Sequence, residues 1–288
     1  EGGFKKNSIN LLVGGPGSGK TLFAMAFLYY GIIKYNENGL YITFEEKKEK
    51  LYDDVKTFNW DLEKLEREKK FVFLEYTPEQ VKKLLVEGGG IIENIVEKHN
   101  IKRLVIDSIT SFSLLYQDEL TKNESSLALF ELIGKWNCTG MLTSQDIRKT
   151  DDESIDSTVG FETDSIIILY HSKKKSGKRL RALEILKMRG TKHAEDIYLL
   201  EITKKGIEVE KGKASLWMKK KTKKIKHVKN RKKTIPKNDD RVPSGINELD
   251  AIIEGGFERE SVTLVAGSAG SGKSIFSAQF IYNGIMKY

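Results

Sequence analysis

The stretch SINLLVGGPGSGKT (residues 8–21) passes from a short apolar run into a glycine-rich loop, and a helical pattern follows it. Its residues Gly14, Gly19, Lys20 and Thr21 fit the pattern G-x-x-x-x-G-K-S/T, which requires this order of strand, loop and helix. Glycines allow the turns that direct consecutive backbone N–H groups at phosphate oxygens, and the helix N-terminus adds a favourable dipole. The stretch therefore predicts an α/β fold with a phosphate-binding loop after one strand.

Such a loop binds a nucleoside triphosphate with Mg²⁺. Lys20 is expected to contact the β and γ phosphates, and the Thr21 hydroxyl is expected to bind Mg²⁺. A glycine turn without a ligand is the alternative, but it does not explain a second loop of the same type later in the chain. The residues expected to bind the nucleotide are Gly15, Pro16, Gly17, Ser18, Gly19, Lys20, Thr21 and Leu22.

That second loop belongs to an internal repeat, because residues 1–35 recur as 254–288 with 18 of the 35 aligned positions identical. A repeat of this period corresponds to a whole domain. The second copy has a lead-in at 241–253 that the first copy lacks, so we expect the sequence to be a piece of a longer tandem protein. Its residues expected to bind a second nucleotide are Gly270, Ser271, Gly272, Lys273 and Ser274.

The charge of the chain is concentrated in one segment. The net charge is +8, but residues 219–237 contain 11 Lys or Arg and no acid, and the rest has 38 basic against 41 acidic residues. A like-charged run with few apolar residues buries too little surface to offset its ordering entropy, which is typical of a linker. We expect a domain at 1–212, a basic linker at 213–240 and the start of a second domain at 241–288.

The apolar and cysteine content exclude several classes of protein. The single cysteine, Cys138, rules out a disulfide framework and a CxxC metal site, which favours a reducing, cytoplasmic location. No run reaches the roughly 18 to 20 apolar residues that span a bilayer. We therefore expect no membrane association.

Two acidic residues follow the next apolar segment. Residues 41–44 read as a strand, and Glu45 and Glu46 come at its C-terminal end. Ligands of open parallel sheets bind at this edge, where an acidic pair would polarise the water that attacks the γ-phosphate. The alternative is that both residues cap the helix that follows.

Two further apolar runs end in polar residues. RLVIDS (103–108) ends in Asp107 and Ser108, and a carboxylate next to the loop strand would hold Mg²⁺ through water. A later strand places Thr143, Ser144 and Gln145 at the same edge, where we expect them to sense the γ-phosphate, with ordinary loop polarity as the alternative.

The pattern changes after these strands. Residues 164–170 and 179–190 form a predicted hairpin, and 197–209 form another. The predicted fold is therefore α/β, a mostly parallel twisted sheet with helices on both faces and a C-terminal antiparallel β extension.

Taken together, the segments GGPGSGKT, ITFEE, RLVIDS, ETDSIIILY and LEILKMRGTKH resemble the KaiC-like ATPases of the RecA superfamily, in the family's order and over essentially all of 1–212. The resemblance implies a RecA-type ATPase core and a homo-oligomeric ring, commonly a hexamer, with ATP held between neighbouring subunits. ATP and Mg²⁺ are the implied cofactors. Glu45 and Glu46 match the catalytic acidic pair, and Asp107 matches the Mg²⁺-associated aspartate.

The same resemblance assigns roles to a basic segment. KMRGTKH matches the segment whose side chains reach a neighbour's ATP, which implies that Lys187 and Arg189 act across the interface and that His193 approaches the nucleotide there. An arginine delivered by a neighbour stabilises the charge of phosphoryl transfer. The alternatives are a solvent-exposed basic hairpin and a structural histidine.

Three functions agree with these observations. We favour an ATP-hydrolysing ring that acts as a switch for unidentified protein partners. A recombinase-like DNA-binding ATPase is less favoured, because the loop at 146–160 has two basic against five acidic residues, although the 219–237 run could bind nucleic acid. An autokinase is disfavoured by Gly160 and Phe161, which lie in the neighbourhood where the second domain of clock-type KaiC has adjacent phosphorylated Ser and Thr residues.

Overall fold

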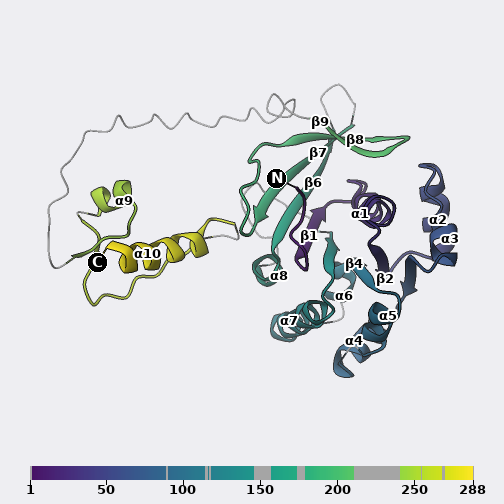
Figure 1. Cartoon of the computed structure of the whole chain (residues 1–288), viewed down its shortest axis with the longest axis horizontal. Helices are drawn as coiled ribbons and strands as arrows, with labels where there is room; N and C mark the ends of the chain where they lie inside the picture. Colours follow the sequence, from purple (N-terminus) through teal and green to yellow (C-terminus); the bar gives the residue numbers. More distant parts are fainter. Residues whose placement is uncertain are drawn as a thin grey trace. The chain divides into compact units, whose positions relative to one another are not determined.

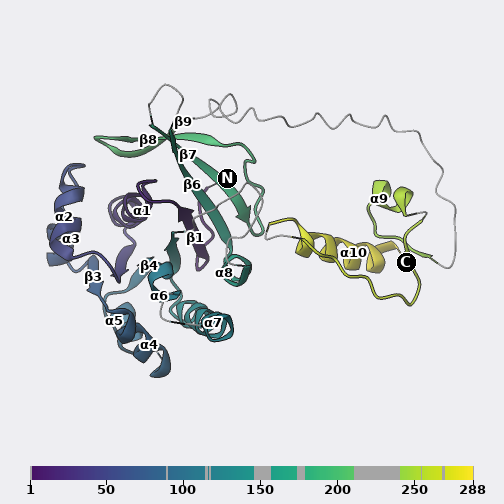
Figure 2. The same cartoon turned by 180° about the vertical axis from the view of Figure 1, so that it is seen from behind.

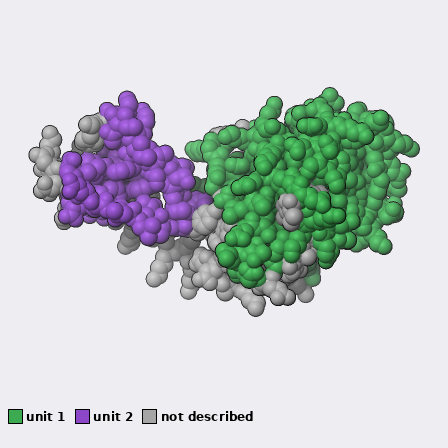
Figure 3. Space-filling model, turned by 90° about the horizontal axis from the view of Figure 1, so that it is seen from below, with its two compact units in different colours: residues 1–219 green, residues 220–288 purple. Residues whose placement is uncertain are grey.

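The computed structural model describes residues 2–88, 90–113, 116, 118–145, 157–173, 179–210, 241–253, 255–267 and 270–287. The chain divides into two compact units, Glu1–Lys219 and Lys220–Tyr288, coloured green and purple in Figure 3. The basic run at 219–237 and the loop at 146–156 lie outside the described residues. No helix in the described ranges is long and apolar enough to cross a membrane.

The first unit is built on a nine-stranded sheet in the order β3-β2-β4-β5-β1-β6-β7-β8-β9. The strands from β3 to β6 in this order pair in parallel, and those from β6 to β9 pair antiparallel. The strands are β1 (Ile9–Gly14), β2 (Asn38–Thr43), β3 (Phe71–Glu75), β4 (Ile101–Asp107), β5 (Thr139–Ser144), β6 (Ser165–Lys173), β7 (Arg179–Met188), β8 (Tyr198–Thr203) and β9 (Gly206–Glu210). This arrangement confirms the predicted fold class.

Helices cover both faces of the parallel part of the sheet (Figures 1 and 2). One face carries α1 (Lys20–Tyr35), α2 (Lys48–Lys56) and α3 (Leu62–Arg67). The other carries α4 (Pro78–Val86), α5 (Gly90–Lys98), α6 (Ile109–Ser113) and α7 (Glu119–Lys135), and α8 (Ser157–Glu162) packs against α7.

Alternation along the strands explains why two helical layers form. Leu12, Tyr41 and Val105 belong to one buried cluster together with Met25 and Leu28 of α1. Successive residues of a strand point to opposite faces of the sheet. The apolar residues between those of this cluster therefore face the helices on the other side. Full burial of each large apolar side chain contributes about 1.5–3 kcal/mol, which is why strands buried on both faces are almost continuously apolar.

The order of the strands corrects one expectation. The strand that ends in Asp107 is not the direct neighbour of the loop strand, because β5 lies between β4 and β1. The strand pairing places Thr43 opposite Asp107 and Val13 opposite Ser144. The parallel strands β1, β2, β4 and β5 therefore still deliver their C-terminal ends to one edge of the sheet.

The second unit has β10 (Arg241–Val242), α9 (Asn247–Ile252), β11 (Phe257–Glu258) and α10 (Lys273–Lys287). The repeat is visible in its packing. Phe257 and Phe280 meet edge to face with centroids 5.8 Å apart, and Phe4 and Phe27, which are 253 positions earlier, meet in the same way at 5.8 Å. Residues 262–267 match β1 in sequence but form no strand in the described part of this unit.

Candidate active site

The glycine loop joins β1 to α1 at the C-terminal edge of the sheet. Gly17 and Gly19 have backbone φ angles of 72° and 102°, a region that residues other than glycine rarely adopt. A Cβ on Gly14 would lie 2.5 Å from Ser18 Oγ and 2.7 Å from the Leu169 carbonyl oxygen of β6. The glycine pattern is thus needed both for the turns and for the close approach of β6.

Lys20 lies back over this loop. Its Nζ donates to the carbonyl oxygens of Gly14 at 2.8 Å and Gly15 at 3.2 Å. Burial lowers the pKa of Lys20, and the nearby charges of Asp107 and Glu45 act in the opposite direction. The ammonium group is therefore held by the carbonyl oxygens of the loop, and the two nearby carboxylates favour its charged form.

Asp107 accepts hydrogen bonds from three hydroxyl groups on three different elements. Thr21 Oγ1 of α1 donates to Oδ2 at 2.9 Å, the Tyr41 hydroxyl of β2 donates to the same oxygen at 2.7 Å, and Thr143 Oγ1 of β5 donates to Oδ1 at 2.5 Å. Tyr41 and Thr143 are fully buried. Burial and the neighbouring Asp107 raise the pKa of Tyr41 well above its usual value, so the phenol remains a donor.

The acidic pair begins where β2 ends. The backbone N–H groups of Glu45 and Glu46 both donate to Thr43 Oγ1, at 3.2 and 3.1 Å. The N-cap of α2 is Lys47, and no side chain caps that helix end. The turn made by Thr43 holds both glutamates at the edge of the sheet.

The two glutamates differ in their partners. Glu45 Oε1 accepts from Ser108 Oγ at 3.3 Å and from Ser111 Oγ of α6. Glu46 lies 4.0 Å from Lys50, and its Oε2 is buried without a hydrogen-bond partner among the described residues. Burial raises the pKa of Glu46, the Lys50 charge lowers it, and Asp107 raises it further.

The end of β5 connects to the same region through α6. Thr110 Oγ1 accepts from the Gln145 N–H at 2.8 Å and lies 3.3 Å from Ser144 Oγ. Because Ser111 follows Thr110 in this short helix, the contact to Glu45 and the contact to the end of β5 arise from adjacent residues.

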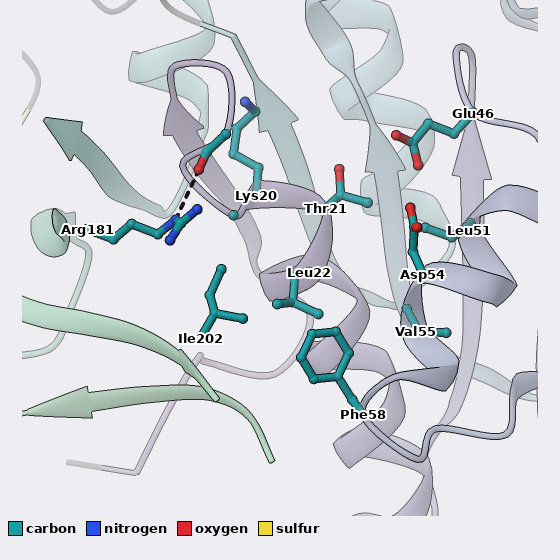
Figure 4. Close-up of a pocket in the computed structure, with 12 residues that line it drawn as sticks. Lys20, Thr21, Leu22, Glu46, Leu51, Asp54, Val55, Phe58, Arg181 and Ile202 are labelled. Atoms are coloured by element: carbon teal, nitrogen blue, oxygen red, sulfur yellow. Dashed lines mark hydrogen bonds between the residues drawn. The ribbon is translucent and has the colours of Figure 1, made fainter. Parts of the chain in front are cut away.

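A pocket of about 290 Å³ opens beside the loop (Figure 4). Phe58, Leu22 and Ile202 gather at one side of it, and Glu46 and Asp54 lie at another. Its full lining is Gly17, Gly19, Lys20, Thr21, Leu22, Glu46, Leu51, Asp54, Val55, Phe58, Arg181 and Ile202.

Most of this apolar lining was not predicted from the sequence. Leu51, Val55 and Phe58 follow helical spacing, which predicts one apolar face of a helix but not that the face borders the loop. Arg181 lies in the predicted hairpin, and its Nε donates to the Gly17 carbonyl oxygen at 3.0 Å, drawn as the dashed line in Figure 4. Only the folding of β7 and β8 over the loop brings Arg181 and Ile202 to the pocket.

The basic residues expected to act on a neighbour lie apart from this pocket. Lys187 of β7 is buried, and its Nζ donates to the carbonyl oxygens of Gly160 at 2.9 Å and Thr163 at 2.5 Å. Arg189 is exposed, and His193 Nδ1 lies 3.2 Å from the Ala194 carbonyl oxygen. The described structure therefore does not bring these side chains to the Lys20 group of their own unit.

The second loop repeats the local geometry of the first. Lys273 Nζ donates to the Gly267 carbonyl oxygen at 2.8 Å, as Lys20 does to Gly14. Gly270 and Gly272 have φ of 81° and 88°, matching the left-handed positions of the first loop. The two loops thus share these backbone turns, although residues 262–267 form no strand in the described part of the second unit.

A mostly parallel sheet that carries this loop at its C-terminal edge, with an acidic pair and an aspartate beside it, defines a RecA-like protein of the nucleotide-binding class. The family model described as "ATPase: KaiC" matches residues 1–214 and 242–288. The chain belongs to the KaiC family of ATPases.

Individual relatives agree with this family. The circadian clock oscillator protein KaiC of Synechococcus elongatus is 31% identical over 288 residues, covering 98% of this chain and 52% of that protein. The protein of the same name from Parathermosynechococcus lividus is 32% identical over 296 residues, covering 99% and 51%. The chain spans about half the length of the curated relatives it matches.

Among solved structures, a KaiC-like protein from the archaeon Pyrococcus horikoshii has a similar fold. Its TM-score is 0.63 and its sequence identity is 34%, covering 73% of this chain and 92% of that one.

Proposed function

We propose that the first unit binds ATP with Mg²⁺ and hydrolyses it. The observation that carries the proposal is the convergence of Lys20, Thr21 and Asp107 with the acidic pair at one edge of the sheet. Phosphoryl transfer depends mainly on positioning and on charge stabilisation, and these residues supply both kinds of group.

The side chains and loop N–H groups at this edge of the sheet suit a nucleoside triphosphate bound with Mg²⁺. Thr21 donates its hydroxyl hydrogen to Asp107, which leaves the oxygen lone pairs available to a cation. Oxygen ligands of this kind are those that Mg²⁺ prefers, with Thr21 as a direct ligand and Asp107 acting through water. Mg²⁺, when bound, would neutralise charge on the triphosphate. The loop N–H groups and Lys20 would bind the phosphates themselves.

The pocket beside the loop has a lining that suits the adenine base of ATP. Phe58, Val55 and Ile202 provide an aromatic and apolar surface next to Thr21, and Arg181 borders it. An adenine ring needs such a surface for stacking, and ligand pockets combine apolar walls with a few polar groups. We propose that the adenine and ribose of ATP occupy the pocket of Figure 4.

We assign the orientation of the attacking water to Glu45. Its carboxylate is held by two serine hydroxyls and lies close enough to influence the charge of Lys20, whose natural partner is the γ-phosphate. Glu46 is assigned a supporting role, because it lines the pocket and its Oε2 has no hydrogen-bond partner among the described residues.

We further propose that the active unit is a ring-shaped homo-oligomer, commonly hexameric in the family resembled, in which Arg189 and His193 approach the nucleotide of a neighbour. Lys187 would join them only after its Nζ leaves the Gly160 and Thr163 carbonyl oxygens. The support is that Arg189 is exposed and none of the three borders the pocket of its own unit. We infer that the nucleotide state of this ring controls the binding of protein partners; the relatives above are named circadian clock oscillator proteins.

Hydrolysis is tested by measuring ADP formation with the Glu45→Gln variant. We expect ATP binding to be retained and the rate to fall by about 10²-fold or more, since the side chain keeps its size and loses its charge. Glu131→Gln, which changes an exposed acid of α7, is the control and should hydrolyse at the normal rate. Equal rates for Glu45→Gln and the unaltered protein would contradict the assignment.

A further inference from the structure

Tyr41 reaches Asp107 from two residues further back along the neighbouring strand. The register pairs Thr43 with Asp107 and Tyr41 with Val105. Two residues along a strand span about 6.6 Å, which a tyrosine side chain covers from Cα to hydroxyl. The hydroxyl arrives 2.7 Å from Asp107 Oδ2.

The ring of Tyr41 is held rigidly in this position. It is fully buried and stacks on Phe73 of β3, with centroids 5.6 Å apart and planes 13° from parallel. It also belongs to the cluster that packs against α1. The hydroxyl is therefore a donor with a fixed direction, unlike a threonine hydroxyl at the surface.

The donors on Asp107 are distributed over both carboxylate oxygens. Thr143 donates to Oδ1, while Tyr41 and Thr21 share Oδ2. A carboxylate held on both oxygens by buried donors has a single orientation. The Tyr41 hydroxyl and the Thr21 hydroxyl approach the same oxygen, so the position of that oxygen determines where Thr21 lies.

We propose that Tyr41 is a positioning residue for the magnesium site, whose hydroxyl fixes the Asp107 carboxylate and, through it, the Thr21 oxygen. The inference rests on the proposed function, because it assigns Thr21 and Asp107 to Mg²⁺. Its consequence is specific to the cation: the hydroxyl contributes to the affinity for Mg²⁺ and not to the contacts of the loop with phosphate.

The test is Tyr41→Phe, which removes the hydroxyl and keeps the ring and its stacking on Phe73. ATP binding is measured by calorimetry in EDTA and across a titration with MgCl₂. We expect affinity in EDTA to stay within about twofold of normal and the half-saturating Mg²⁺ concentration to rise about tenfold, the usual effect of losing one hydrogen bond to a charged group.

A matched control is available in Tyr52→Phe. The Tyr52 hydroxyl also donates to a carboxylate, Glu66 Oε2, at 3.2 Å, but neither residue lines the pocket beside the loop. We expect its half-saturating Mg²⁺ concentration to be unchanged. A rescue variant with 4-aminophenylalanine at position 41 retains an N–H donor and should restore the normal value.

The outcomes separate the two proposals. If the unaltered chain binds ATP without any effect of Mg²⁺, the proposed function fails. If it responds to Mg²⁺ and Tyr41→Phe responds identically, the role of Tyr41 is overturned while the function stands. If Tyr41→Phe fails to fold, or loses as much affinity for ATP in EDTA as in MgCl₂, the hydroxyl has a general structural role. Either result would also overturn the inference.

Discussion

Glu45 and Glu46 are adjacent in sequence but experience different surroundings. Ser108 and Ser111 hold one oxygen of Glu45, whereas Glu46 is half-buried with one oxygen lacking a hydrogen-bond partner in the described structure. A carboxylate with fixed donors is oriented, and a carboxylate without them is destabilised as an anion. We therefore make a separate prediction for each glutamate.

The first concerns Ser111. Ser111→Ala removes a donor from Glu45, so the carboxylate loses part of its orientation and we expect kcat to fall about tenfold with KM for ATP unchanged. Ser111→Thr keeps the hydroxyl and should retain most of the rate. Ser113→Ala is the control, because Ser113 donates to Ile109 in the same short helix and does not contact Glu45. Steady-state ADP release measures all three, and a raised KM without a change in kcat would contradict this role.

The second concerns Glu46 and pH. The folded-state pKa of Glu46 is raised above 4.5, so between 4.5 and that raised value the folded chain binds more protons than the unfolded chain. Its contribution to stability therefore falls as pH rises through this window. We expect Glu46→Gln to stabilise the ligand-free protein at pH 7.5, by less than about 1 kcal/mol because the side chain remains partly exposed, and to have little effect at pH 4.

Urea unfolding at the two pH values measures this effect. Glu49→Gln changes an exposed acid in the first turn of α2 and serves as the control. A Glu46→Gln variant that is less stable than the unaltered chain at pH 7.5 would show that Glu46 is favourably paired.

At the scale of elements, the loop depends on how closely β6 approaches β1. The two strands pair in parallel from Asn10 with Ser165 to Gly14 with Leu169. A Cβ on Gly14 would meet the Leu169 carbonyl oxygen, which belongs to the backbone of a central strand and cannot move aside cheaply. A Cβ on Gly15 would meet nothing within 4 Å.

These two glycines form a matched pair for mutation. We expect Gly14→Ala to lower the free energy of unfolding of the ligand-free protein by about 1–3 kcal/mol, the usual cost of overpacking, and Gly15→Ala to change it by well under 1 kcal/mol. Chemical denaturation without nucleotide is the measurement. Equal effects of the two substitutions would mean that the close approach of β6 does not control the loop.

For the whole molecule, the proposed ring requires two chains to complete each site. Lys20 would act on the nucleotide of its own chain and Arg189 on that of a neighbour, so neither Lys20→Ala nor Arg189→Ala should hydrolyse ATP efficiently alone. We expect a loss of about 10³-fold for Arg189→Ala, the scale of an arginine acting across an interface.

Mixing the two variants provides the decisive measurement. Hybrid rings contain some sites with an intact Lys20 facing an intact Arg189, so ADP formation should rise on mixing to about a quarter of the normal rate. Lys205→Ala, a change in the turn between β8 and β9, is the control and should neither lose activity nor gain it on mixing. Absence of any gain would place Arg189 outside the site of a neighbour.

Much of the fold followed from local patterns. Alternating apolar strands and helices predicted the α/β core, and the turn-separated runs after residue 164 predicted the antiparallel strands β6 to β9. The insertion of β5 between β1 and β4 was not predicted, because strand order depends on which faces pack together and leaves no local trace in the sequence.

The sequence by itself determined the loop, since glycines at fixed positions encode its left-handed turns, and Gly270 and Gly272 adopt such turns even where no strand forms beside them. Only the tertiary structure decided which residues surround the loop and Asp107. Tyr41, Phe58 and Arg181 come from separate elements, and their positions depend on strand register and packing across the sheet. Those are long-range properties that neighbouring residues in the chain do not specify.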